Sequence, residues 1–445
     1  MNDWQDAELR FERALELVRQ RKWPLALEEM KAATSINPFN ASWFYNLGVI
    51  LDEMTRHEEA LEAFGRALQI EPDNLVVRER LGVDLYRTGR LKQAIHAFER
   101  LAQIEPSHEP SYCHRILIYS TMGRHEQAEE MFYTARLYKD ECPRCYDHMG
   151  RSLLARGRFD RAIFCFQRCL DLDPSFPSGA RRLAAAFWGK GDLEQARRQY
   201  LAELRHDPGS GPTLLDLGNV LMEMGRVDEA GEKFRRCIEL LPDDAAGYFH
   251  HGRWLVRAQR RAEAQLAFRH AIKLDPTFRG AHLELARIAL SCGQRYEARQ
   301  QLRAEHLMHP EEPRMLLALA NLWMDCGHDR TAIACLKRLL LIRPADQDGW
   351  LNLAVAQFRR GLYPEGKRSC TKALQIDPRC RLAMHNLALA EDHMGHYSLA
   401  LEWTRQAMEL EPRDAALKRL ETRLRLLCAF QAAVNWVRGM LGMRD

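Results

Sequence analysis

The sequence predicts an all-α protein, a solenoid of paired helices, and three observations carry this prediction. Proline recurs every 34 residues from Pro38 to Pro412, with Asp140 as the one departure. Glycine and alanine recur at fixed places inside the same period, and apolar residues between them follow helical spacing. A short unit that repeats in one register folds as a stack in which each repeat contacts its neighbours.

The period divides residues 7–414 into twelve repeats without an insertion. Residues 1–6 are expected to form a short leader, and residues 415–445 a capping helix with an apolar tail. No shift in composition separates the repeats into domains. The repeats start at residues 7, 41, 75, 109, 143, 177, 211, 245, 279, 313, 347 and 381.

Each repeat is predicted to contain two helices. The first spans about fourteen positions and ends at the fifteenth, which is glycine in nine of the twelve repeats and suits a left-handed residue. The second carries an apolar stripe, as in Ala60, Phe64, Ala67 and Leu68, and ends at the proline. Position twenty is alanine in eleven repeats and Gly366 in the other, so two backbones must approach closely there.

The junction between the fourth and fifth repeats departs from the pattern in three ways. Position eight is glycine or alanine in the other repeats, whereas the fourth has Ile116, which is expected to splay the paired helices. The stopping proline is replaced by Asp140, and a Cys-Pro-Arg-Cys segment runs from Cys142 to Cys145. A local change in the array is therefore expected here.

At the fixed positions, the second repeat has Phe44, Leu47-Gly48, Ala60, Phe64, Ala67 and Pro72. This pattern resembles the tetratricopeptide repeat family, although the family's second aromatic residue is missing from this repeat. The resemblance covers residues 7–414. It implies a right-handed superhelix of antiparallel helix pairs whose first helices line a concave groove, and a role in binding proteins.

Composition and charge exclude several classes of protein. A formal net charge of +4 in 445 residues does not indicate a nucleic-acid binder that neutralises phosphates. The N-terminal residues lack the pattern of a secretory signal, and no run of eighteen apolar residues predicts a membrane span. Twelve cysteines without such a signal favour a reducing cytoplasm over a disulfide framework.

The sequence contains no recognisable catalytic motif. There is no GxSxG, no glycine-rich phosphate loop and no HExxH, and the histidines and carboxylates follow helix surfaces. About thirty residues follow the last repeat, too few for a catalytic domain. We therefore expect a non-enzymatic scaffold or adaptor without a cofactor, whose partners are extended segments of other proteins.

In the resembling family, positions two, five, six, nine, twelve and thirteen of the first helix face the ligand. At position six, five of the six residues from the third repeat to the eighth are Arg or His. A basic trough of this kind would bind acidic peptides, and its histidines could make binding pH-dependent. Alternatively, these residues only keep the helix surfaces hydrated and bind no ligand. The basic candidates are Arg80, His114, His148, Arg151, Arg181, Arg182, His250, Arg253 and Arg287.

Asparagines occupy other groove positions and could hold a peptide backbone by their side-chain amides. The candidates are Asn46, Asn321, Asn352 and Asn386. The family's carboxylate clamp also requires basic residues, and Leu317 stands where one of them should be, so the clamp is rejected. The two ends of the array could instead hold backbone while the middle binds charge.

Four cysteines near the irregular junction form a second candidate site. Cys165 and Cys169 lie one helical turn apart, and the antiparallel pairing returns the end of their helix beside Cys142 and Cys145. Four thiols, or three with His148, could bind zinc, and a CxxC also permits redox chemistry. The protein would then be a metal- or redox-responsive regulator. Alternatively, these cysteines are small apolar core residues.

Beyond the last repeat, five apolar residues keep helical spacing and are expected to cap the array. They are Leu417, Leu420, Leu424, Leu427 and Val434. Residues 426–443 carry one charge, Arg438, and more apolar residues than a cap should bury. The excess indicates self-association or contact with a membrane surface. Besides the scaffold and the metal- or redox-responsive regulator, a third hypothesis is that the protein is a structural subunit of a larger assembly.

Overall fold

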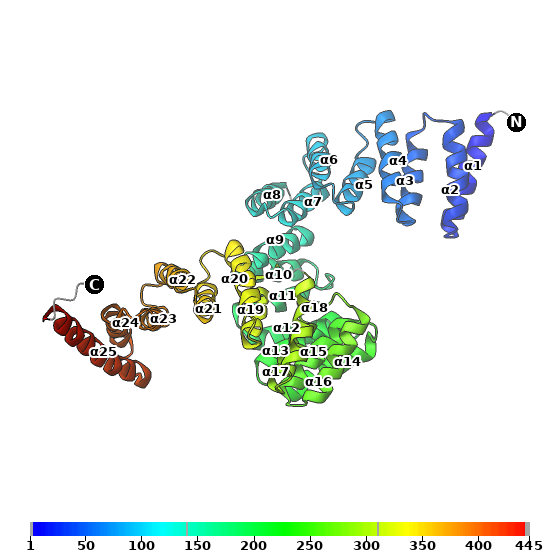
Figure 1. The fold of residues 1–445 in the computed structure, drawn as a ribbon. Coiled ribbons are helices and arrows are strands. Elements are labelled where there is room, and N and C mark those ends of the chain that lie inside the picture. The colour runs from blue at the N-terminus through cyan, green and yellow to red at the C-terminus, as the bar shows by residue number, and fades with distance from the viewer. Residues whose placement is uncertain (1–2, 139–140, 309–310, 441–445) are drawn as a thin grey trace. The chain divides into compact units, whose positions relative to one another are not determined.

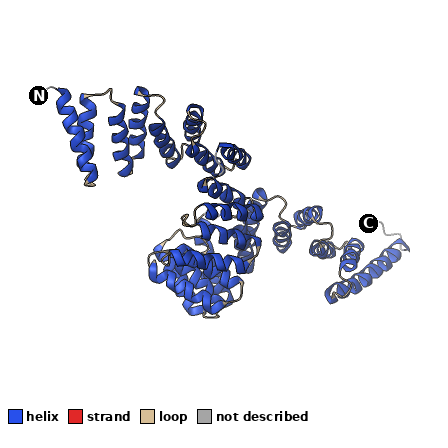
Figure 2. Cartoon of the chain, turned by 180° about the vertical axis from the view of Figure 1, so that it is seen from behind, coloured by secondary structure: helices blue, strands red, loops and turns tan. Residues whose placement is uncertain are grey.

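A computed structural model describes residues 3–138, 141–308 and 311–440, with side chains up to residue 436, and every element in these ranges is a helix (Figures 1 and 2). Helices account for 80% of the chain, which confirms the all-α prediction. Asp140 and residues 441–443 of the predicted tail lie outside the described residues. No helix in these ranges has the length and apolar character needed to cross a membrane.

The helices follow one another as first and second members of twelve repeats, and α25 follows the last repeat. The first helices are α1 (Asp3–Arg19), α3 (Ala41–Glu53), α5 (Leu75–Arg87), α7 (Glu109–Thr121), α9 (Pro143–Ala155), α11 (Gly179–Lys190), α13 (Gly211–Glu223), α15 (Ala245–Arg257), α17 (Ala281–Ser291), α19 (Pro313–Asp325), α21 (Gln347–Arg359) and α23 (Arg381–His393). The second helices are α2 (Trp23–Ile36), α4 (His57–Ile70), α6 (Leu91–Ile104), α8 (His125–Tyr138), α10 (Phe159–Leu172), α12 (Leu193–His206), α14 (Val227–Leu240), α16 (Arg261–Leu274), α18 (Arg295–Leu307), α20 (Asp329–Ile342), α22 (Tyr363–Ile376) and α24 (Tyr397–Leu410). The final helix is α25 (Ala415–Met440).

The contacts within the chain gather into two compact units, residues 1–233 and residues 234–445. The division falls within α14 and does not interrupt the register of the repeats. We call them the N-terminal unit and the C-terminal unit.

Three first helices begin at residues other than the predicted repeat starts. The first helix, α1, begins at Asp3, so it takes in most of the predicted leader, where Asp6 pairs with Arg10 at 2.9 Å. α11 and α17 begin two residues late, at residues 179 and 281, because the preceding Ser178 and Gly280 have left-handed backbones with φ of 56° and 89°.

The glycines at position eight let an aromatic ring of the second helix pack directly on the first. A Cβ added at Gly48 would lie 2.5 Å from the ring of Phe64, and one at Gly150 would lie 2.6 Å from Phe166. Such contacts are shorter than van der Waals separation, so each ring needs a glycine beneath it. Ile116 is fully buried instead, and α7 and α8 still pack as a pair.

The first helices of successive repeats also contact one another. In the N-terminal unit these contacts link α5, α7, α9, α11 and α13, and in the C-terminal unit they link α17, α19, α21 and α23. Within each unit, a second helix packs between the first helix of its own repeat and that of the next, as α10 does between α9 and α11 and α20 does between α19 and α21. Side chains of neighbouring first helices therefore share a surface within each unit.

Candidate binding surface and thiol cluster

Two arginines of the predicted basic trough are paired with acids of neighbouring first helices. Arg181 Nε donates to Asp216 Oδ2 at 2.8 Å, and Arg182 Nη1 donates to Asp147 Oδ1 at 2.8 Å. In each pair the partners are 35 residues apart, one period plus one position. Acids at positions five and six of the first helices therefore offset part of the charge of the predicted trough.

The remaining arginines are more accessible. Arg287 pairs with Glu284 on its own helix at 3.1 Å and stays exposed. Arg80, Arg151 and Arg253 are exposed, and within the described ranges none of the three forms an ion pair. These three guanidinium groups are available to an anionic ligand.

The three candidate histidines are packing residues. Burial lowers the pKa of His114 to about 4, that of His148 to about 3 and that of His250 to about 4. His114 stacks on Phe98 with 4.7 Å between ring centroids. All three imidazoles are neutral at physiological pH, so they contribute no positive charge and do not supply the expected pH-dependent binding near neutrality.

The four candidate asparagines lie on first helices of both units. Asn46 on α3 donates to the carbonyl of Ser42 at 2.7 Å, one turn earlier in the same helix. The Oδ1 atom of Asn321 on α19 is buried and accepts no hydrogen bond from any described residue. Asn352 on α21 and Asn386 on α23 are half-buried. The amides of the C-terminal unit therefore lie on consecutive, contacting helices.

The structure brings three cysteines together at the start of α9, and they are not the predicted four. Cys113 on α7 lies with its Sγ 3.1 Å from that of Cys142 and 2.8 Å from that of Cys145. Cys165 and Cys169 on α10 are buried but lie outside this group, which we call the thiol cluster. The correction has a simple cause, because α7 packs along α9 and places position five of the fourth repeat beside the start of the fifth.

Hydrogen bonds within the thiol cluster shift its acidities in opposite directions. Contacts with Cys113 and Cys145 lower the pKa of Cys142, whose Sγ also accepts the backbone N–H of Cys145 at 3.2 Å. The contact with Cys142 raises the pKa of Cys113, and contacts with Cys113 and then Cys142 raise the pKa of Cys145. One thiolate is thus stabilised by two thiols and a helix N-terminus.

A cavity of about 160 Å³ borders the thiol cluster. Its walls include Cys113, His148, Arg144 and Glu109. A side-chain hydrogen bond with Glu109 contributes to the lowered pKa of Cys142, after the larger contributions of Cys113 and Cys145. The Nδ1 atom of His148 is buried without a hydrogen bond to any described residue, and Asp147 lies 3.6 Å from it.

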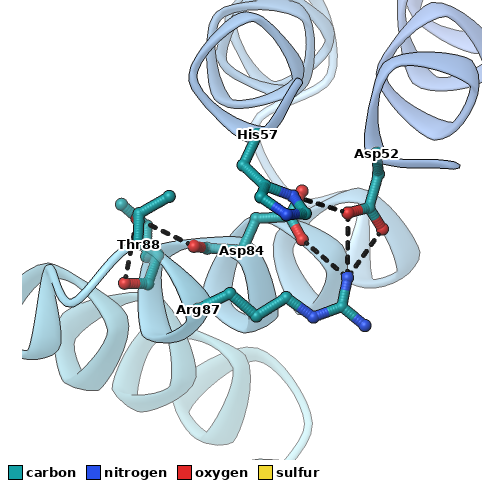
Figure 3. A network of polar contacts seen from close by, with 6 residues as sticks. Asp52, His57, Asp84, Arg87 and Thr88 are labelled. Carbon is teal, nitrogen blue, oxygen red and sulfur yellow. Dashed lines mark hydrogen bonds and ion pairs between the residues drawn. The ribbon is translucent and has the colours of Figure 1, made fainter. Parts of the chain in front are cut away.

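A polar network joins the second and third repeats (Figure 3). Asp52 accepts from Arg87 Nη1 at 2.8 and 2.9 Å and lies 2.9 Å from His57 Nδ1. Asp84 accepts from the same nitrogen at 3.3 Å, and burial followed by repulsion from Asp52 raises its pKa to about 6. The guanidinium of Arg87 occupies the place where these acids would bind a cation, so the network is a contact between repeats.

The last helix, α25, divides into a buried and an exposed half. Leu417 and Leu424 are fully buried against the last repeat, as a cap requires. Leu426, Phe430 and Trp436 are 69%, 70% and 65% exposed. The second half of α25 therefore presents apolar side chains to solvent.

Comparison with known protein families supports the assignment of the paired helices to repeats. Profiles described as tetratricopeptide repeat match residues 11–74, 148–212 and 215–277 in one case and residues 53–114 in another. The chain belongs to the tetratricopeptide repeat family. Such repeats form protein-binding scaffolds, and the family is generally non-catalytic.

Sequence matches to individual proteins cover only part of each chain, and the structural match extends over nearly the whole chain at low identity. A CTR9 homolog of Arabidopsis thaliana is 28% identical over 138 residues, covering 28% of this chain and 13% of that protein. Protein bimA of Emericella nidulans is 27% identical over 140 residues, covering 31% of this chain and 17% of that protein. The Cut9–Hcn1 hetero-tetramer of the APC/C aligns with a TM-score of 0.44 and 13% identity, covering 92% of this chain and 95% of that chain.

Proposed function

We propose that the protein is a non-enzymatic scaffold whose first helices bind extended, acidic segments of partner proteins. The observation that carries this proposal is the shared surface of contacting first helices in the N-terminal unit, on which Arg80 and Arg151 are exposed without an ion pair among the described residues. A guanidinium forms paired hydrogen bonds with a carboxylate, so an acidic side chain is the ligand it fits best.

The paired arginines have a different role in this proposal. Arg181 and Arg182 are held in place by Asp216 and Asp147, and their remaining N–H groups can still donate to a ligand. Because Asp147 is buried, Arg182→Glu would place a second carboxylate beside it and destabilise the fold. Charge reversal is therefore tested at the exposed arginines, where it should not destabilise the fold.

The test is the affinity of a labelled poly-glutamate peptide, measured by fluorescence anisotropy at low and physiological salt. We expect Arg80→Glu with Arg151→Glu to weaken binding about tenfold or more. The matched control is Lys92→Glu with Arg158→Glu, which makes the same change in net charge at exposed residues outside the first helices. Circular dichroism should be the same for all three proteins.

Two results would contradict the proposal. If the peptide does not bind the wild-type protein at physiological salt, the surface is not a site for acidic segments. If the control reversal weakens binding as much as the first-helix reversal does, the attraction comes from the overall charge of the protein and not from this surface.

We also propose a cytoplasmic location. The support is that all twelve cysteines are free thiols, and eleven of these twelve are at least half-buried. A reducing compartment suits such a set. Labelling of the intact cell by a membrane-impermeant thiol reagent, followed by mass spectrometry, should leave the exposed Cys292 unmodified.

A further inference from the structure

We propose that Cys113, Cys142 and Cys145 bind a zinc ion that braces the junction between the fourth and fifth repeats, with Glu109 as the fourth ligand. The site goes beyond the scaffold function and does not depend on it. Its evidence is the convergence of three buried thiols beside a cavity whose wall includes Glu109.

The geometry of the thiol cluster fits a tetrahedral ion. The three sulfur atoms all lie within 4.8 Å of one another, and each cysteine is almost fully buried. Zn–S bonds of about 2.3 Å place the sulfurs of a tetrahedral site about 4 Å apart. Small rotations of the side chains would therefore open the cluster around an ion without moving the helices. Three thiolates are soft ligands, which favours zinc over magnesium or calcium.

The backbone at the start of α9 holds the Sγ atom of Cys142 in place and stabilises its thiolate form. Cys142 is the N-cap residue, and its Sγ accepts the N–H of Cys145 at 3.2 Å. Pro143 occupies the first turn and restricts the segment between the two cysteines. Helix N-termini and N–H donors stabilise negative charge, so a thiolate is favoured where the ion would bind.

The fourth ligand comes from the same helix as Cys113. Glu109 is four residues earlier on α7, so both side chains lie on one face, and both line the cavity beside the thiol cluster. Arg144 lines the adjoining cavity and offsets part of the negative charge that three thiolates and a carboxylate leave around a divalent ion. On binding, each thiol that carries a proton releases it to water, and three Zn–S bonds and one Zn–O bond replace the bonds between the ion and its water molecules.

The location supplies a structural reason for the ion. The segment between α8 and α9 lacks the stopping proline found in the other repeats, because residue 140 is aspartate. A zinc ion would tie α7 directly to the start of α9, across the second helix of the fourth repeat. Metal binding in a folded site adds to folding stability, so the ion would compensate for the irregular junction.

The first test is the metal content of the full chain, purified under reducing conditions without chelator. Inductively coupled plasma mass spectrometry should find about one zinc per chain in the wild-type protein. Cys113→Ser and Cys145→Ser should each retain less than about a tenth of it. Cys169→Ser is the matched control, because Cys169 is equally buried nearby but lies outside the cluster, and it should retain the wild-type content.

The second test keeps the proposal falsifiable if a cysteine variant fails to fold. Titration of the metal-free wild-type protein with Co²⁺ should produce the absorption bands of a tetrahedral thiolate complex, and Glu109→Gln should weaken Co²⁺ binding about tenfold. Chelation should lower the unfolding temperature of the N-terminal unit.

Three results would overturn the proposal. One is a wild-type protein that contains no zinc and yields no tetrahedral spectrum with Co²⁺. Another is loss of metal from Cys169→Ser equal to that from Cys113→Ser. The third is a disulfide between two of the three cysteines, found by mass spectrometry of protein isolated under reducing conditions. An unchanged Co²⁺ affinity in Glu109→Gln would remove Glu109 from the ligand set.

Discussion

At the scale of single residues, the position that ends the first helix has a left-handed backbone in all twelve repeats. Glycine occupies nine of these positions, and Arg21, Thr55 and Gln259 occupy the others with φ of 55°, 59° and 60°. At such φ the Cβ atom of a side chain comes too close to the backbone, and the clash is most severe for a residue with a branched Cβ. Thr55 is therefore the most strained of the three.

We expect Thr55→Gly to raise the free energy of unfolding of the N-terminal unit by about 1 kcal/mol. The relief of strain outweighs the added freedom of glycine in the unfolded chain. Urea unfolding followed by circular dichroism measures the change. The converse substitution, Gly89→Thr, is the control and should lower the free energy of unfolding by at least as much. A destabilised Thr55→Gly protein would show that the threonine side chain has a stabilising contact.

A second effect at this scale is the pH dependence that Asp84 produces. The folded protein raises the pKa of this carboxyl to about 6 from an ordinary value of 3.8. The folded state thus binds the proton more tightly than the unfolded state does. Stability from this group is fully present below pH 3.8 and is lost as the pH rises through about 6.

We therefore expect Asp84→Asn to stabilise the N-terminal unit at pH 8 by on the order of 1–2 kcal/mol, and to change it little at pH 4. The amide stays neutral at both values, still accepts from Arg87 and can donate to Asp52. Thermal unfolding across this pH range measures the effect. The exposed Asp171→Asn is the control and should show no such difference. Equal effects at the two pH values would mean that shape, not charge, is responsible.

At the scale of elements, α25 combines a cap with an exposed apolar surface. The buried residues Leu417, Leu420 and Leu424 all precede residue 426, and Leu426, Phe430 and Trp436 follow. The two roles can therefore be separated by the place at which the chain is cut.

Truncation after Arg425 should keep the cap and leave the stability of the C-terminal unit unchanged, while abolishing any self-association or binding to lipid vesicles. Truncation after Asp414 should lower the unfolding temperature, because it uncovers the last repeat. Analytical ultracentrifugation and vesicle sedimentation provide the measurements. If the protein cut after Arg425 keeps its oligomeric state and its vesicle binding, the exposed half of α25 has neither role.

At the scale of the whole molecule, cooperativity is limited because each repeat contacts only its neighbours. The contacts gather into two units, and the core of each contains aromatic rings of second helices. Phe64 in the N-terminal unit and Phe268 in the C-terminal unit are both fully buried. A single free energy of unfolding does not describe such a chain.

We expect Phe64→Ala to destabilise the N-terminal unit by about 3–5 kcal/mol while leaving the C-terminal unit nearly unchanged, and Phe268→Ala to do the reverse. Hydrogen exchange followed by mass spectrometry reports the stability of each unit separately. A loss of protection spread evenly over both units in either variant would show that the array unfolds as one cooperative body.

The positions of the helices, their ends and the small residues between them could be read from the sequence. Proline, the glycine at position fifteen and the alanine at position twenty act through local backbone geometry and close packing, which recur every 34 residues. Their effect does not depend on distant residues. The apolar leucines of the cap follow from the same helical spacing.

Only the tertiary structure decided which side chains of different repeats meet. Arg182 meets Asp147 and Arg181 meets Asp216 because a first helix is offset against the next by one position beyond the period. Packing of α7 along α9 likewise brings Cys113 to Cys142. Cys169 stays buried in the core between the two helices of the fifth repeat. Spacing along the chain determines the face on which a residue lies, whereas the rotation and offset of neighbouring helices depend on how their side chains interlock.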